Sequence, residues 1–144
     1  MKKLILAFFL ISCAQNSTEY IDQEKDKADI QQVLDQQVID WNNFNVEGFM
    51  EGYWKSPELK FIGSSGITYG WQQTLDGYKE RYPSQEHMGV LNFNILKIEF
   101  IATDSYLVIG EFHLERSIGN ADGIFSLIFK RIDNKWVIIA DHTS

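Results

Sequence analysis

The sequence has few of the residues that cross-link a small protein or bind metal: one cysteine, two prolines and three histidines in 144 residues. Because Cys13 is the sole thiol, no disulfide can form within the chain. His87, His113 and His142 lie far apart, without the His-x-His or His-x-x-x-His spacing of metal ligands. We therefore expect a fold held by its apolar core, with no metal site.

The sequence also lacks the motifs of several common enzyme classes. It has no glycine-rich phosphate-binding loop and no Gly-x-Ser-x-Gly nucleophile turn, and Ser64-Ser65-Gly66 is better explained as a hairpin turn. We expect no cofactor. Acidic residues outnumber Lys and Arg by 20 to 13, for a net charge of −7. Because so acidic a surface repels phosphate backbones, we also expect no nucleic-acid partner.

The first residues have the features of an export signal. Lys2 and Lys3 precede an apolar run over residues 4–11. A helix needs about 20 residues to cross about 30 Å of hydrocarbon, so this run is too short to span a membrane. It is typical of a secretory signal peptide.

The segment from Leu10 to Cys13 resembles the lipobox of bacterial lipoproteins, in which the cysteine is acylated and becomes the new N-terminus. The resemblance implies a signal peptide over residues 1–12, followed by lipidated Cys13 and a polar, flexible tether over 13–25. The expected location is the bacterial cell envelope, on a lipid anchor in the membrane. Ala14, where an inner-membrane retention aspartate would otherwise stand, favours the outer membrane.

The remaining chain has the size and composition of one folded domain. Removing twelve residues from 144 leaves 132, which is enough to bury a core without cross-links. Hydrophobic residues make up 44% of the sequence and aromatic residues 14%. We expect a single domain over residues 26–144.

Apolar residues recur at helical spacing in the first half of this domain. Ile30, Leu34, Val38 and Trp41 fall on one stripe, for example. The pattern predicts helices over residues 26–43, 46–53 and 71–82, the last ended by Pro83, and two short strands over 59–62 and 67–69.

The second half has the pattern of long strands separated by turns. The predicted strands cover residues 91–101, 105–116, 123–132 and 135–143. Helices followed by a meander predict an α+β domain whose antiparallel sheet twists and curls strongly. Both faces of the last strand are apolar, so we expect helices on one face of the sheet and a second copy of the chain, in a homodimer, on the other.

This order of elements resembles the nuclear transport factor two-like superfamily, a cone of curved sheet around three helices, and within it the SnoaL-like and domain-of-unknown-function branch of bacterial exported proteins. The resemblance covers about residues 25–144. It rests on the segments WNNFNVEGF (41–49), FIGSSG (61–66), YGW (69–71), GIFSLIFK (123–130) and KWVIIADHTS (135–144).

The resemblance implies a functional cavity in the mouth of the cone, between the concave face of the sheet and the helices. We expect an aromatic-lined void of about 300 Å³ or more. The aromatic residues placed to reach it could orient a flat or apolar ligand or could simply form the core: Trp41, Phe44, Tyr53, Trp54, Tyr78 and Tyr82.

Four ionisable residues on the predicted strands are candidates for catalysis. Glu111 and His113 stand two apart, so both project from one face, as a general-base pair in a pocket or as exposed surface residues. Asp141 and His142 are neighbours and point to opposite faces. One of them could pair with Arg116 or His113, and capping of the last strand is the alternative to catalysis.

These observations predict an exported, lipid-anchored domain that binds a small, partly apolar molecule. The alternative is an isomerase, cyclase or dehydratase without a cofactor, with His113 or Asp141 as general base and Tyr53, Tyr78 or Tyr82 as hydrogen-bond donor. The steroid isomerase of similar fold uses such chemistry, but its catalytic residues do not match this sequence position by position. A pure oligomerisation domain is the third possibility.

Overall fold

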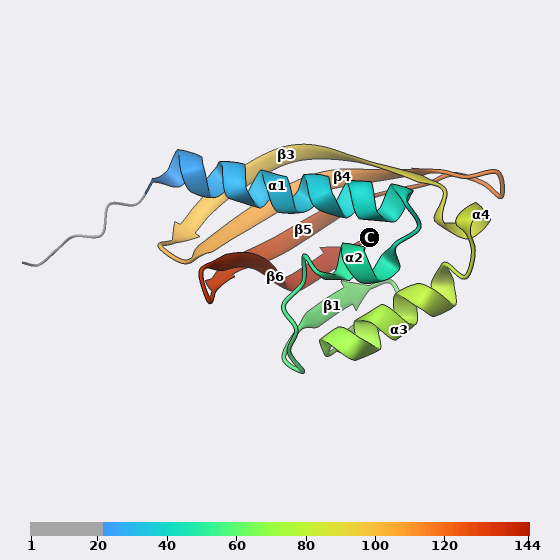
Figure 1. Cartoon of the computed structure of the whole chain (residues 1–144), viewed down its shortest axis with the longest axis horizontal. Coiled ribbons are helices and arrows are strands. Elements are labelled where there is room, and N and C mark those ends of the chain that lie inside the picture. Colours follow the sequence, from blue (N-terminus) through green and yellow to red (C-terminus); the bar gives the residue numbers. More distant parts are fainter. Residues whose placement is uncertain (1–21) are drawn as a thin grey trace, which may run out of the picture.

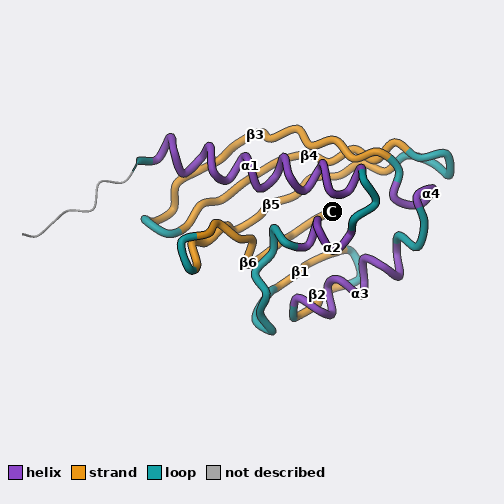
Figure 2. Tube along the Cα trace, viewed as in Figure 1, coloured by secondary structure: helices purple, strands orange, loops and turns teal. Residues whose placement is uncertain are grey.

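The computed structural model describes residues 22–144, an α+β domain in which helices lie across one face of a curled sheet (Figures 1 and 2). The predicted signal peptide, Cys13 and residues 14–21 of the predicted tether lie outside the described residues.

The helices form the first half of the domain, as predicted. The long helix α1 covers Gln23–Asn42 and starts three residues before the expected domain boundary, because Asp22 caps it by accepting a hydrogen bond from the Lys25 N–H at 3.0 Å. α2 covers Val46–Met50 and α3 covers Trp71–Arg81, and a short additional helix, α4, follows at Gln85–Met88. None of the helices described over 22–144 is both long and apolar enough to cross a membrane.

The six strands form one sheet in the order β2-β1-β6-β5-β4-β3. The short strands β1 and β2 form a hairpin, and the four long strands form the predicted meander. Their bounds are Lys60–Gly63 for β1, Gly66–Tyr69 for β2, Val90–Ala102 for β3, Ser105–Glu115 for β4, Ala121–Ile132 for β5 and Lys135–Thr143 for β6.

One pair departs from the antiparallel arrangement expected from the sequence. β1 runs parallel to β6, with Phe61 opposite Asp141, so the sheet is mixed. Two parallel strands cannot be joined by a tight hairpin, so the chain between β1 and β6 passes through β2, α3, α4 and the first three strands of the meander. The chain just before β1 also pairs with β6, because the Ile138 N–H donates to the Gly52 carbonyl and the Trp54 N–H to the Ile138 carbonyl, both at 2.9 Å.

The long strands curl as predicted, and bulges help them do so. The register between β3 and β4 shifts at Ile95/Lys97 and again at Phe100/Ala102, and that between β5 and β6 shifts at Ile128/Phe129. A bulge bends its strand and increases the local twist. The sheet therefore remains open and curved, and its concave face receives the helices (Figure 1).

The core lies between α1 and the concave face of the sheet. Alternate residues of each strand point inward, so that Tyr106, Val108, Phe129 and Ile138 are fully buried. Ile30 and Leu34 of α1 cover them. At the narrow end of the sheet the Tyr106 and Trp136 rings pack in a T-shaped contact.

Polar contacts fix both ends of α1 to the sheet. At its start, buried Asp26 pairs with Arg131 of β5 and accepts a hydrogen bond from the Tyr106 hydroxyl at 3.3 Å. At its end, the Asn42 amide donates to the Leu91 carbonyl at 3.0 Å and accepts from the Leu91 N–H at 2.7 Å. The helix therefore spans the sheet from its narrow end to its wide end, where the remaining helices lie.

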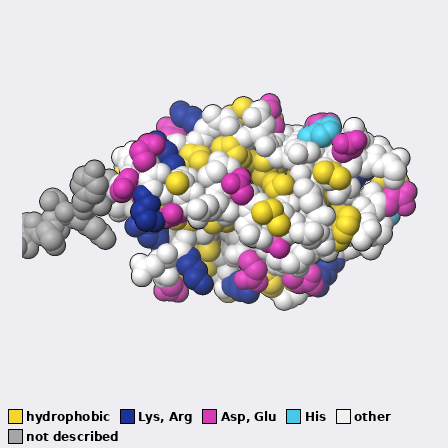
Figure 3. Space-filling model, turned by 45° about the horizontal axis from the view of Figure 1, so that its top comes forward, with side chains coloured by type: hydrophobic (Ala, Val, Ile, Leu, Met, Phe, Trp, Pro, Cys, Tyr) yellow, Lys and Arg dark blue, Asp and Glu magenta, His cyan; other side chains and the backbone are white. Residues whose placement is uncertain are grey.

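Charged side chains of both signs are distributed over the surface in Figure 3, with apolar side chains exposed between them in the middle of this face. Among the exposed apolar residues are Ile39, Leu96 and Ile124.

Candidate functional site

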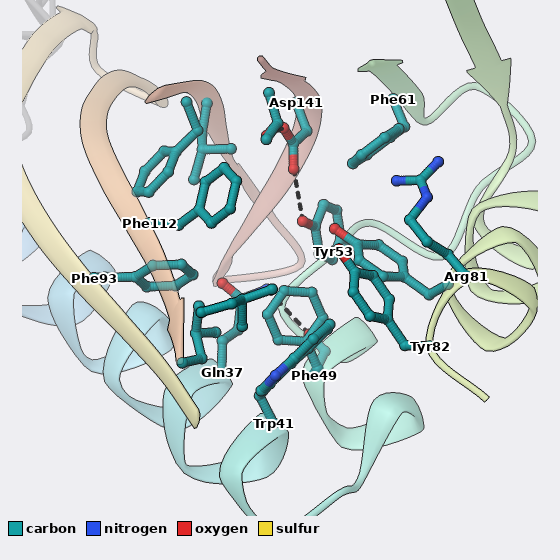
Figure 4. A pocket seen from close by; sticks show the side chains of 16 residues that line it. Gln37, Trp41, Phe49, Tyr53, Phe61, Arg81, Tyr82, Phe93, Phe112 and Asp141 are labelled. Atoms are coloured by element: carbon teal, nitrogen blue, oxygen red, sulfur yellow. Dashed lines mark hydrogen bonds between the residues drawn. The ribbon is translucent and has the colours of Figure 1, made fainter. Parts of the chain in front are cut away.

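A partly open cavity of about 80 Å³ lies at the wide end of the sheet (Figure 4). It is bounded by the second half of α1, by α2, α3 and β1, and by the adjoining ends of β3 to β6. Its lining residues are Gln37, Trp41, Phe49, Tyr53, Phe61, Tyr78, Arg81, Tyr82, Leu91, Phe93, Phe112, Leu114, Phe125, Leu127, Asp141 and Thr143.

The cavity is in the expected place but is smaller than the predicted 300 Å³. Ring side chains occupy much of the space, because Trp41 packs edge-on against Phe49, Tyr78 and Tyr82 with ring centroids 4.8 to 6.0 Å apart. The Trp41 indole N–H donates to the Met88 carbonyl at 3.1 Å, so this ring is held in place. The aromatic residues thus serve as core and as cavity wall together.

Asp141 supplies the buried carboxyl of the site. Its side chain comes from the inward face of β6 and is only 3% exposed. The Tyr53 hydroxyl donates to one carboxyl oxygen at 2.7 Å, and the Thr143 hydroxyl donates to the other at 2.6 Å. Figure 4 shows Asp141 and Tyr53 facing each other across the cavity wall.

The backbone pairing of residues 52–54 with β6 places Tyr53 opposite this carboxyl. The two hydrogen bonds on either side of Tyr53 hold its backbone alongside Ile138, three residues before Asp141 on the same strand. Its side chain is buried and packs on the Phe49 ring, with centroids 5.9 Å apart. The contact between Tyr53 and Asp141 therefore joins segments 88 residues apart in sequence.

Burial raises the pKa of the Asp141 carboxyl, although the hydrogen bonds from Thr143 and Tyr53 and the proximity of His142 partly oppose that rise. Burial also raises the pKa of the Tyr53 hydroxyl, and the adjacent Asp141 adds to the effect. The pKa of Tyr78 is raised in the same way. The site thus combines a carboxyl that resists ionisation with phenols that remain protonated donors, which is a suitable arrangement for proton transfer.

Three polar lining residues were not singled out as site residues from the sequence. Gln37 lies on the buried stripe of α1 and donates to the Phe49 carbonyl at 3.0 Å. Thr143 stands two residues after Asp141 and so shares its face. Arg81, the last residue of α3, lines the opening. The helical spacing placed Gln37 inward. Strict alternation from buried Trp136 and Ile138 would turn Thr143 outward, and the register shift between β5 and β6 brings Asp141 and Thr143 to the inward face instead. No sequence pattern marked Arg81.

Of the expected lining residues, Trp41, Tyr53, Tyr78 and Tyr82 lie in the cavity wall and the other three do not. Phe44 is 42% exposed, in a turn where its positive φ of 60° reverses the chain between α1 and α2. Trp54 follows Tyr53 along an extended segment and so points the other way. Arg116 donates to the carbonyls of Gly119 and His87, beside the β4–β5 turn.

Glu111, His113 and His142 do not line the cavity, and so the expectation that they share a site with Asp141 is corrected. Alternation along β4 puts the small or apolar inward residues on one face and Glu111 and His113 on the outer face. There Asn94 donates to Glu111 at 2.8 Å, and His113 pairs with Asp122. His142 is exposed, on the face of β6 opposite Asp141. Of the four catalytic candidates, only Asp141 enters the cavity.

No group of three or more His, Cys, Asp or Glu side chains within residues 22–144 is arranged to hold a metal ion.

Comparison with known proteins identifies the family. No family profile and no curated protein matches the sequence. Among solved structures, a nuclear transport factor 2-like (NTF2-like) protein of unknown function from Shewanella oneidensis has a TM-score of 0.80 and 35% sequence identity, covering 83% of this chain and 98% of that chain. This chain belongs to the NTF2-like superfamily.

More distant structures share the NTF2-like fold alone. An NTF2-like protein of unknown function from Pseudomonas putida has a TM-score of 0.67 and 12% identity, over 84% of this chain and 87% of that chain. The hexachlorocyclohexane dehydrochlorinase LinA-type3 from Novosphingobium barchaimii has a TM-score of 0.70 and 17% identity, over 85% and 88%. The predicted superfamily, with its resemblance to the SnoaL-like branch, and the predicted cone-shaped α+β fold are confirmed.

The raised pKa of Asp141 predicts how the Asp141→Asn substitution changes stability with pH. The unfolded carboxyl titrates at about pH 3.9, and the folded one above it. The stabilising contribution of this group is therefore complete below the unfolded pKa and is lost as pH rises through the folded pKa. Asn cannot ionise, so the free energy of unfolding of the variant should rise relative to wild type as the pH increases from about 4 through the folded pKa.

Urea unfolding at several pH values measures this difference. Asp76→Asn, at an exposed carboxyl on α3, is the matched control and should follow the wild-type pH profile. A constant difference between Asp141→Asn and wild type across this pH range would contradict the assignment.

Proposed function

We propose that this protein is an exported, lipid-anchored NTF2-like domain that binds a small, partly apolar molecule in the cavity at the wide end of its sheet. The observation that carries the binding role is the cavity itself, in which ring side chains surround a polar group of Asp141, Tyr53 and Thr143. Binding sites for small molecules have this composition, mostly apolar with a few converging polar groups.

The size of the cavity restricts the ligand to a single ring or a smaller molecule. A cavity of about 150 Å³ is sufficient for benzene, whereas the space here is about 80 Å³. A single ring would therefore be admitted with a small outward shift of the side chains at the opening, Tyr82 and Arg81. Hexachlorocyclohexane, after which the dehydrochlorinase of similar fold is named, is also a single-ring compound, which supports this class.

Filling the cavity should weaken binding without removing any polar group. Leu127 lies opposite Asp141 in the β5–β6 register and lines the cavity. Leu127→Phe should weaken binding of single-ring compounds at least tenfold, because the added ring occupies their space, at a cost of about 1 to 3 kcal/mol in stability. Ligand-observed NMR with a panel of such compounds, together with native mass spectrometry for a co-purified molecule, measures this.

Leu127→Met preserves side-chain volume and is the matched control, so it should bind as the wild type does. Leu114→Phe fills the same cavity from β4 and replaces Leu127→Phe if that variant fails to fold. The binding role is refuted if the wild-type protein carries no small molecule and binds none of the panel.

A second candidate function, proton transfer catalysed without a cofactor, is favoured by one observation. Asp141 is a carboxyl of raised pKa inside an apolar cavity, with the Tyr53 hydroxyl fixed beside it. Such a carboxylate is a stronger base than a solvated one, and a phenol can stabilise the negative charge that develops on a substrate oxygen. This proposal retains Asp141 as general base and no longer uses His113.

Hydrogen–deuterium exchange at the carbons beside the carbonyl of cyclohexanone tests this chemistry on a single-ring substrate. The wild-type rate above the buffer background should rise with pH as Asp141 ionises, and Asp141→Asn should lower it about 100-fold or more. Asp76→Asn is again the control. An Asp141→Asn protein that exchanges as fast as wild type would leave binding as the sole function.

The lipid anchor depends on Cys13, the only cysteine in the sequence. Cys13→Ser should leave the domain folded and abolish its association with membranes, because no other thiol can be acylated. Fractionation of bacterial cells followed by detergent extraction measures this, with Ser17→Ala as the control. Continued recovery of the Cys13→Ser protein in the membrane fraction contradicts anchoring through Cys13.

We also propose a homodimer through the outer face of the sheet. Leu107, Ile109 and Ile128 of β4 and β5 form an apolar centre there, with Ile124 55% exposed beside them. Charged and polar residues, Glu111 and Lys130 among them, lie around this centre, as at the rim of an interface. Sedimentation of the purified protein tests the proposal, and a protomer mass at all concentrations contradicts it.

A further inference from the structure

The three arginines of the sequence differ in the contacts that their guanidinium groups make. Arg131 pairs with buried Asp26, and Arg116 donates to two backbone carbonyls. Arg81 makes no ion pair with any of the carboxylates that the structure describes over residues 22–144. Its guanidinium instead borders the cavity, beside Phe61 and above Tyr82 in Figure 4. A cation at the opening of an apolar cavity that has no ionic partner among residues 22–144 is available to a ligand.

The cavity wall is divided into a polar and an apolar side. Asp141, Thr143, Tyr53, Tyr78 and Arg81 come from β6, from the segment before β1 and from α3. The side chains that β3, β4 and β5 contribute are all apolar, and Leu127 among them is the cross-strand neighbour of Asp141: Leu91, Phe93, Phe112, Leu114, Phe125 and Leu127. Figure 4 shows Phe93 and Phe112 on the side opposite Arg81. A ligand with one flat apolar part and one polar end matches this division.

The charges of Asp141 and Arg81 determine which kind of polar group on a ligand the cavity can bind. Both oxygens of Asp141 already accept a hydrogen bond from a hydroxyl group, and the side chain is only 3% exposed, so a ligand cation would reach it only by losing its own water shell inside the cavity. Arg81 is exposed and presents the planar donor fork that matches a carboxylate. The available charge at the opening is therefore positive.

We infer that the cavity takes a single-ring carboxylate, with its ring against the phenylalanine side of the wall and its carboxylate on the guanidinium of Arg81. This inference rests on the proposed binding function and specifies its ligand class. Arg81 is then the residue that determines specificity, by selecting an anionic ligand in a protein whose overall charge is negative.

Three probes of the same ring and nearly the same size separate the possibilities: benzoate, benzamide and benzylamine. Their dissociation constants, from ligand-observed NMR titrations at low ionic strength, should place benzoate about tenfold tighter than benzamide, as expected for a charge-assisted pair. Benzylamine should bind most weakly. Added salt should weaken benzoate and leave benzamide unchanged, because screening acts on the charged pair alone.

Substitution of Arg81 tests whether this side chain causes the preference for benzoate over benzamide. Arg81→Gln should bring benzoate to the affinity of benzamide and leave benzamide unchanged, and Arg81→Lys should retain part of the preference, since it keeps the charge but not the fork. Lys79→Gln is the matched control, because Lys79 lies on the same helix, pairs with Glu47 and does not line the cavity. Circular dichroism verifies that each variant is folded.

The outcomes distinguish failure of the carboxylate inference from failure of the proposed binding function. If no probe binds the wild-type protein, the proposed function fails for single-ring ligands. If benzamide binds as tightly as benzoate, or if Arg81→Gln preserves the preference, the cavity binds rings and the role of Arg81 is wrong. Tighter binding of benzylamine would overturn the inference in favour of Asp141 as the ligand's partner.

Discussion

The curl of the four-stranded meander is the constraint on which the other features of this domain depend. A curled sheet is narrow at one end and wide at the other, and its apolar concave face must be covered along its whole length. At the narrow end α1 alone suffices, where Asp26 pairs with Arg131 and Tyr106 packs on Trp136. At the wide end α2, α3 and large rings cover the sheet together with the end of α1, and the edge-on packing of these rings leaves the cavity.

The polar group in that cavity follows from how the chain closes the sheet. Because residues 52–54 and β1 both pair with β6, Tyr53 and Phe61 lie beside the inward face of β6, on which Asp141 stands. A carboxyl in such surroundings is costly unless it is hydrogen-bonded or protonated. Here two hydroxyl groups donate to it while burial raises its pKa, so it is stable in the fold without a cationic partner. This leaves it available for chemistry.

The sequence predicted those features that depend on local periodicity. The bounds of α1 and of the four meander strands agree with the predicted ranges to within three residues. The buried face of α1 and the inward face of β4 are also those that the periodicity indicated. Tyr53 was expected in the cavity, but its contact with Asp141 could not be predicted, because it depends on a parallel pairing with β6 across 85 residues, between Tyr53 and Ile138. For the same reason, alternation showed that Glu111 and His113 share a face but not that this face is the outer one. The role of Arg81 depends on the end of a helix meeting the opening of a cavity, which no spacing encodes.

Arg81 and Asp141 give the site opposite charges at different depths, and this difference limits what the cavity can do. In the proposed complex, the carboxylate of the ligand lies on Arg81 at the opening and its ring lies inside the cavity. The ring carbons are then the ligand atoms nearest Asp141. The raised pKa of Asp141 lessens the repulsion between the two carboxyl groups, because the inner one resists ionisation. Binding and proton transfer therefore favour different pH values: anion binding is strongest while Asp141 is protonated, and base catalysis requires it ionised. A protein selected for binding gains from the deep burial of Asp141, whereas an enzyme with this geometry would have to operate above the pKa of that group.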